Sequence, residues 1–111
     1  MPRPVRFHRS FLRDIAGNIR WLLTHRAPEE RARLRAALVS FNARIGAHPA
    51  LGEEFERRGS RSYRVFPLGG SLPYLVWYYY DAAHEDGPIW LVMLIHEAQD
   101  RERFDPDRFE P

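Results

Sequence analysis

Cysteine and lysine are both absent from this sequence of 111 residues, so each of its 17 basic residues is an arginine. Without cysteine the chain has no disulfide framework, no thiolate metal site and no cysteine nucleophile, which fits a reducing compartment. Without lysine it has no lysine general base, whereas arginine binds phosphate or carboxylate through a planar fork that stays charged. The sequence also lacks an N-terminal stretch of signal type and an apolar run near the ~20 residues of a membrane span. We therefore expect a soluble, cytoplasmic protein without a membrane partner.

The composition predicts one folded domain. Hydrophobic residues make up 44% of the chain, as in globular proteins, and the length is enough for one hydrophobic core. We expect the domain to span residues 1–111, with its core at 5–104 and a tail at 105–111. The formal net charge is only +2, so the chain permits an acidic or nucleic-acid partner without requiring one.

The first half of the sequence has a helical pattern. A short alternating segment at 5–8 predicts a strand, and Ser10 stands where a helix N-cap is expected. Apolar residues at helical spacing from Phe11 then predict a helix over about 10–25. A second apolar stripe, with proline in its first turn and Gly46 at its end, predicts another helix. The two helices form an antiparallel hairpin.

The second half is rich in aromatic and β-branched residues, which favour strands. We predict strands at 62–66, 74–80 and 89–96, a polar loop at 82–87, and a polar connector over 51–59. The order is β-α-α-β-β-β. This predicts an α+β fold in which an N-terminal strand and an antiparallel helix hairpin pack on a small antiparallel β-sheet.

The strands at 74–80 and 89–96 are apolar at both odd and even positions, so both faces of the sheet must be covered. Either the connector and the C-terminal tail cover the second face, or a partner chain does. Trp21 lies outside the core stripe of the first helix, which is compatible with a surface residue or with an anchor for a protein partner. We name four candidate partner-binding aromatics: Trp21, Tyr74, Tyr78 and Trp90.

A second group of polar residues could carry chemistry. Arg61, Arg64 and His96 lie on or beside predicted strands, and Glu97 follows directly. Two arginines, a histidine and a carboxylate can bind a phosphodiester and move protons. A histidine at a strand end is also a common structural residue, so both interpretations stay open. No motif indicates a cofactor, and no histidine spacing indicates a metal site.

Taken in order, several segments resemble the RelE/ParE superfamily of type II toxin–antitoxin toxins. The matching segments cover about residues 5–104 and are the strand at 5–8, SFLRDI at 10–15, the helix hairpin, AHPALG at 47–52, Arg64, the tyrosine-rich strand at 74–80, and the stretch from Ile95 to Asp100. The HPALG and IHEAQD segments are similar to those of the ParE-like branch.

The resemblance implies a toxin that inhibits DNA gyrase by protein–protein binding and is neutralised by a cognate antitoxin. The RelE-like alternative is a ribosome-dependent mRNA endoribonuclease, in which Arg61, Arg64, His96 and Glu97 would be catalytic. The nuclease branch commonly uses lysines, which this chain lacks. A third possibility is a non-toxic binding module derived from such a toxin.

Overall fold

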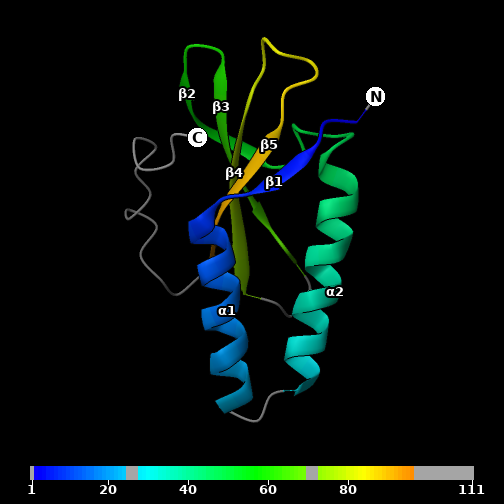
Figure 1. The fold of residues 1–111 in the computed structure, drawn as a ribbon, viewed down its shortest axis with the longest axis vertical. Coiled ribbons are helices and arrows are strands. Elements are labelled where there is room, and N and C mark those ends of the chain that lie inside the picture. Colours follow the sequence, from blue (N-terminus) through cyan, green and yellow to red (C-terminus); the bar gives the residue numbers. More distant parts are fainter. Residues whose placement is uncertain (1, 25–27, 70–72, 97–111) are drawn as a thin grey trace.

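The computed structural model describes residues 2–24, 28–69 and 73–96. Its elements follow the chain in the order β1 (Val5–Phe7), α1 (Arg9–Thr24), α2 (Pro28–Ile45), β2 (Glu53–Arg58), β3 (Arg61–Pro67), β4 (Tyr74–Asp81) and β5 (Ile89–His96). Figure 1 shows the two helices running antiparallel beside the sheet. The predicted α+β fold with a helix hairpin is confirmed. Within the described residues, neither helix is long and apolar enough to cross a membrane.

The sheet differs from the prediction in two ways. Its strand order is β1-β5-β4-β3-β2, and β1 runs parallel to β5, so the sheet is mixed and not wholly antiparallel. The predicted polar connector at 51–59 contains β2, which pairs antiparallel with β3. The polar sequence concealed this strand because an edge strand tolerates charged side chains.

The helix hairpin buries one face of the sheet, which we call the helix face. Phe11 of α1 and Phe41 of α2 are 1% exposed, and they pack with the even-numbered residues of β4. Phe41 lies edge-on to Tyr78, with ring centroids 5.8 Å apart. Alternation along β4 therefore explains why its even positions need aromatic or aliphatic residues.

The opposite face, which we call the second face, is also buried. Its cluster consists of Tyr63, Leu75, Trp77, Tyr79, Val92, Met93 and Ile95, and each is at most 8% exposed. Phe55 of β2 packs edge-on to Trp77 at 4.8 Å, so the predicted connector does contribute to this cover. Because these side chains are already buried in the chain, this face leaves little apolar surface for a partner. The burial therefore disagrees with the interpretation in which a partner covers it.

The start of α1 corrects a second prediction. The helix begins at Arg9, and His8 caps it: the Nδ1 of His8 accepts a hydrogen bond from the backbone N–H of Ser10 at 3.2 Å. Ser10 is therefore not the cap. Its Oγ lies 2.8 Å from His8 Nδ1 and 2.5 Å from the Val92 carbonyl oxygen, so its one proton serves these two acceptors. Burial, and secondarily the charge of Arg9, lowers the pKa of His8, which keeps Nδ1 available as an acceptor.

Helix α1 also takes the place of a missing strand beside β5. Strand β1 covers β5 only as far as Leu91, and a β-bulge follows at Val92. Beyond that point, the Asp14 carboxylate accepts a hydrogen bond from the Leu94 N–H at 3.0 Å. Together with Ser10, Asp14 therefore bonds backbone groups of β5 that none of the described strands reaches.

The pKa of His8 predicts how stability depends on pH. A folded-state pKa below the usual 6.5 means that the unfolded chain binds more protons as the pH falls below that value, so stability declines with acidification. Asparagine caps helices without titrating. We expect the free energy of unfolding, measured with urea from about pH 7 to pH 5, to fall less steeply in His8→Asn than in the wild type. His48→Asn, at an exposed position, is the control; equal slopes in all three proteins would contradict the assignment of His8 as the cap.

The Asp14 contact predicts a large loss of stability for a small change. Asp14→Ala leaves the Leu94 N–H without its acceptor, which should lower the free energy of unfolding by about 1–3 kcal/mol. Asp14→Asn keeps an acceptor and should lose less. Urea denaturation measures both, with Asp86→Ala in an exposed loop as the control; an Asp14→Ala protein as stable as that control would refute the role of the contact.

Candidate functional site

The segment Pro49–Gly52, which carries the family-like HPALG pattern, is held by the hydroxyl of Tyr78. That hydroxyl donates to the Pro49 carbonyl at 2.7 Å and accepts from the Gly52 N–H at 2.8 Å. The ring of Tyr78 is fully buried, and burial raises the pKa of its hydroxyl to about 12. The hydroxyl therefore stays protonated and keeps its donor role at physiological pH.

Arg64 holds the same segment from the neighbouring strand. Its Nη1 donates to the Gly52 carbonyl at 2.7 Å and to the Ala50 carbonyl at 3.3 Å, and its Nε donates to Ser62 Oγ at 3.0 Å. The Ser62 hydroxyl in turn donates to Glu54 at 2.6 Å, and this hydrogen bond is the main reason that the pKa of Glu54 is lowered. Arg64 therefore holds the HPALG loop against the sheet. We call Arg64 and Tyr78, which both bond this loop, its bracket.

Glycine is required at the centre of this arrangement. A Cβ atom on Gly52 would lie 2.7 Å from the Val65 carbonyl oxygen and 2.9 Å from the Tyr78 hydroxyl oxygen. Both distances are shorter than real Cβ contacts allow, so any larger residue would push the segment away from the sheet. The glycine of the HPALG pattern therefore allows this loop to pack closely against β3 and β4.

The structure does not bring the predicted nuclease residues together. Arg61 lies on the second face, with its guanidinium 5.0 Å from the centroid of the Tyr79 ring, and it pairs in register with Asp81. His96 is half-buried at the opposite end of the sheet, edge-on to Tyr74 with centroids 5.4 Å apart. Their partners on β4, Asp81 and Tyr74, are seven residue steps apart, which corresponds to about 23 Å.

The other two predicted nuclease residues are Arg64 and Glu97. Arg64 faces the helix side of the sheet, with its guanidinium 5.8 Å from the centroid of the Tyr80 ring. It lies between the ends that hold Arg61 and His96 and is engaged with the HPALG loop. Glu97 lies outside the described residues. Phosphate binding and proton transfer require groups within a few ångströms of one scissile bond, and the three described residues do not meet this condition.

The four predicted partner-binding aromatics separate into two pairs. Tyr74 and Tyr78 are 3% and 0% exposed and belong to the core beneath the helices, which disagrees with a partner-binding role. Trp21 is 52% exposed on α1, and Trp90 is half-buried at the rim of a cavity. Only the two tryptophans therefore retain surface for a partner.

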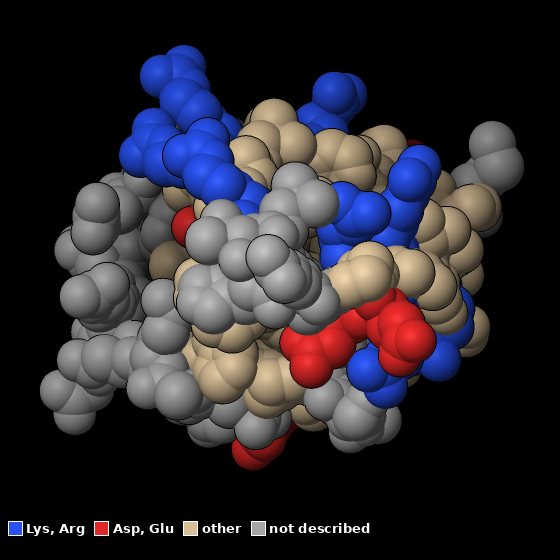
Figure 2. Space-filling view, turned by 90° about the horizontal axis from the view of Figure 1, so that it is seen from below, with Lys and Arg blue, Asp and Glu red and all other residues tan. Residues whose placement is uncertain are grey.

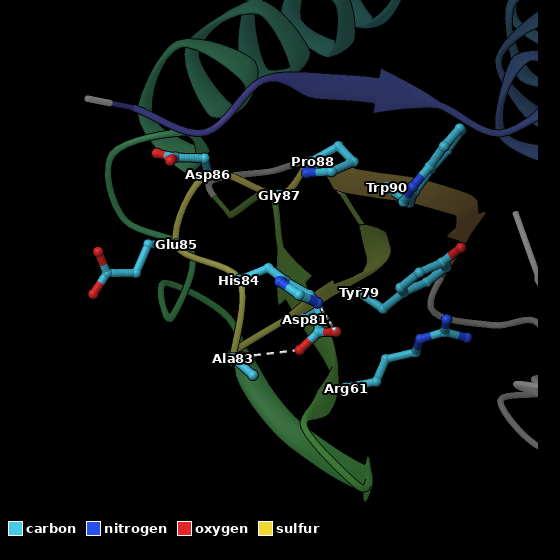
Figure 3. Close-up of a pocket in the computed structure, with 10 residues that line it drawn as sticks. All are labelled: Arg61, Tyr79, Asp81, Ala83, His84, Glu85, Asp86, Gly87, Pro88 and Trp90. Carbon is cyan, nitrogen blue, oxygen red and sulfur yellow. Dashed lines mark hydrogen bonds and ion pairs between the residues drawn. The ribbon is translucent and has the colours of Figure 1, made fainter.

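That cavity has a volume of about 910 Å³ and lies at the end of the sheet beside the β4–β5 loop. It is lined by Arg61, Tyr79, Asp81, Ala83, His84, Glu85, Asp86, Gly87, Pro88 and Trp90. Figure 3 shows Arg61, Tyr79 and Trp90 together on one side, whereas the carboxylates of Glu85 and Asp86 point away. The Asp81 carboxylate lies 3.6 Å from His84 Nε2, and its pKa is lowered mainly by a hydrogen bond from Ser60.

Arg3 is a residue whose role the sequence did not indicate. Its Nη1 donates to the carbonyls of Asp81 at 3.1 Å and Gly87 at 3.2 Å, so it closes the β4–β5 loop. Its backbone N–H donates to the Gly46 carbonyl at 2.8 Å, which links the N-terminus to the end of α2. An arginine before a short strand carries no local signal of these distant contacts.

The outer surface of the helices is basic and partly apolar. The exposed arginines of α1 and α2 are Arg9, Arg13, Arg20, Arg33, Arg35 and Arg44. Figure 2, seen from the end where the helices meet, shows arginines at several places around the margin, with acidic side chains and uncharged surface among them. Leu12 and Val39 are 53% and 64% exposed on these helices. Among His, Asp and Glu in the part of the chain that the structure describes, no group of three is arranged to hold a metal ion.

Comparison with solved structures supports the fold. The chain is similar to the crystal structure of the toxin–antitoxin complex RelBE2 from Mycobacterium tuberculosis, with 21% identity and a TM-score of 0.53, covering 86% of this chain and 99% of that one. The class of protein is then given by a family model, described as the ParE toxin of the type II toxin–antitoxin system parDE, which matches residues 5–101. The chain therefore belongs to this family and is a type II toxin of the RelE/ParE superfamily. No curated protein matches the sequence.

The bracket around the HPALG loop predicts the effect of two substitutions. Tyr78→Phe removes the hydroxyl and leaves the Pro49 carbonyl and the Gly52 N–H without their partner, which should cost about 1–3 kcal/mol of unfolding free energy. Arg64→Ala should cost a similar amount by releasing the Gly52 carbonyl.

Urea denaturation measures both losses, with Arg61→Ala as the matched control. Arg61 is half-buried on the other face of the sheet, and its removal should change stability by less than about 1 kcal/mol. Equal denaturation midpoints for Arg64→Ala and Arg61→Ala would show that Arg64 does not act as a bracket.

Proposed function

We propose that this protein is the toxin of a toxin–antitoxin pair and that it arrests growth by binding DNA gyrase, without cutting RNA. Membership of the ParE family supports a toxin of this branch. The observation that carries the proposal is the placement of Arg61, Arg64 and His96. One of them brackets the HPALG loop, and the other two lie at opposite ends of the sheet.

A nuclease would need a different arrangement. Stabilising a pentavalent phosphate requires cationic donors aimed at the same oxygens, and proton transfer requires an acid or base within hydrogen-bond reach. Among the described residues, the arginine best placed on the sheet is instead hydrogen-bonded to the Gly52 carbonyl. Inhibition by protein binding makes no such demand, because affinity comes from a few anchoring side chains on a surface.

A cognate antitoxin is the second partner in this proposal. The similar RelBE2 toxin was solved in a complex with its antitoxin. Among the helix side chains that the structure describes, Leu12, Trp21 and Val39 are large, apolar and exposed, and each has an exposed arginine within one turn in the sequence. Exposed apolar side chains with basic neighbours fit contact with an acidic protein segment that has an apolar side.

The test is a DNA supercoiling assay with the purified full-length chain. We expect loss of gyrase supercoiling at stoichiometric excess of the toxin, and recovery when the small protein encoded beside the toxin gene is premixed with it. His96→Ala should inhibit as the wild type does, because His96 packs on Tyr74 away from Arg61 and Arg64. Unchanged supercoiling at every toxin concentration would rule out gyrase as the target.

A parallel translation assay separates the alternatives. Cleavage of mRNA on ribosomes that is abolished by both Arg64→Ala and His96→Ala would favour the endoribonuclease. Normal growth of a bacterial host that expresses the chain without antitoxin would favour a non-toxic binding module. Stable folding of each variant is checked by circular dichroism, since Arg64 also supports the fold.

A further inference from the structure

Strand β2 is an edge of the sheet with an unusual distribution of charge. Among the described strands it pairs only with β3, at the end of the order β1-β5-β4-β3-β2. Its sequence from Glu53 to Arg58 reads EEFERR, so acidic residues fill the first part and arginines the last. These side chains are partly exposed, Arg57 by 46% and Arg58 by 43%. Within the strand Arg57 is paired with Glu54 and Arg58 with Glu56, so a contact between two chains would exchange these partners. An edge of this kind usually prevents association between strands, unless the charges of the incoming strand are complementary.

The charges of β2 are complementary to the same strand running in the opposite direction. If two copies pair antiparallel about a twofold axis, Glu53 of one chain lies opposite Arg58 of the other, and Glu54 lies opposite Arg57. The twofold axis repeats both contacts, so each pairing brings together four acid–arginine pairs and no like-charged pair. Opposite charges directly across an antiparallel ladder stabilise it.

The β-bulge in β2 makes the faces agree as well. Glu53 and Arg58 pair with Val65 and Arg61, which lie on the second face, whereas Glu54 and Arg57 pair with Arg64 and Ser62 on the helix face. The register shift places the two central residues of β2 on the same face. Phe55 packs on Trp77 of the second face, and Glu56 pairs with Tyr63, which also lies on that face. The order in which the side chains from Glu53 to Arg58 point to the two faces is therefore the same from either end of the strand.

Without the bulge, this register would fail. In a regular strand of six residues, the first and last side chains point to opposite faces, so the antiparallel partner of Glu53 would lie across the sheet from it. The extra residue restores the match. Among registers that pair at least four residues of the strand, it does so only for the one in which the charges are complementary. Two independent features, charge order and facing pattern, thus select the same pairing.

From these features we infer that β2 is the contact surface for a second copy of this chain, and that the two sheets join edge to edge through β2. The other edge is less suited to this role. Strand β1 has only three residues, and the part of β5 beyond it is bonded by Ser10 and Asp14 of α1. The inference is independent of the target of the toxin.

Sedimentation equilibrium of the full-length chain at low ionic strength tests the contact. We expect a monomer–dimer equilibrium that weakens with added salt, because exposed ion pairs are screened. Arg58→Glu places like charges opposite Glu53 and should raise the dimer dissociation constant about tenfold or more. The double variant Glu53→Arg/Arg58→Glu restores opposite charges and should recover the dimer. Glu85→Arg, in the exposed β4–β5 loop, is the matched control.

A crosslink gives a second readout that does not depend on affinity. Because the chain has no cysteine, Glu56→Cys introduces a single thiol near the proposed axis. The two copies of position 56 would lie about 6 Å apart, from the spacing and rise of paired strands, which is within reach of a disulfide. We expect mild oxidation to give covalent dimers from Glu56→Cys and far fewer from Glu85→Cys.

Several outcomes would overturn the proposal. These are a monomer at all concentrations in low salt, a dimer unaffected by Arg58→Glu, or equal crosslinking at positions 56 and 85. An edge that binds only the antitoxin, seen as a size increase on adding that protein to an otherwise monomeric chain, would also overturn it.

Discussion

The arrangement of this protein depends on two central strands that must be buried on both faces. β4 and β5 carry apolar side chains at successive positions, so neither can face water on either side. The helix hairpin meets this requirement on one face through Phe11, Leu34 and Phe41. On the other face, Tyr63 of β3 and Phe55 of β2 join the aromatic cluster. The other elements are positioned so that they cover the two faces of these strands. The polar groups lie at the edges and ends of the sheet.

Tyr78 and Arg64 show how a family-like pattern can mark a structural requirement. Each residue extends from the sheet to the backbone of the loop at 49–52, and Gly52 lies where no side chain fits. An arginine at such a position looks like a phosphate ligand when only the sequence is read. Its hydrogen bonds to the carbonyls of Ala50 and Gly52 give it a different task, because a guanidinium that fixes a loop has a restricted orientation. An arginine on β3 can therefore have a purely structural role, so its presence alone does not indicate a nuclease.

The sequence predicts those parts of the fold that depend on local periodicity. Both helices and the strands β3, β4 and β5 follow from the spacing of apolar residues, and the need to bury both faces follows from β4 and β5 alone. What could not be predicted depends on contacts between distant residues. β2 is concealed by its charges, His8 replaces Ser10 as the cap because Ser10 reaches Val92, and Arg3 bonds the loop at 81–87. For the candidate site, residue types were identified, but their separation across two faces and two ends required the strand register.

The parallel pairing of β1 with β5 has a consequence for synthesis of the protein. Val5, near the start of the chain, is in register with Ile89, near its end. A nascent chain cannot close this pair until β5 has left the ribosome, because contacts of high sequence separation form only when both segments are available. A prematurely terminated product that lacks β5 also lacks the backbone groups to which Ser10 and Asp14 bond. A translation product that stops before β5 is therefore unable to complete the fold.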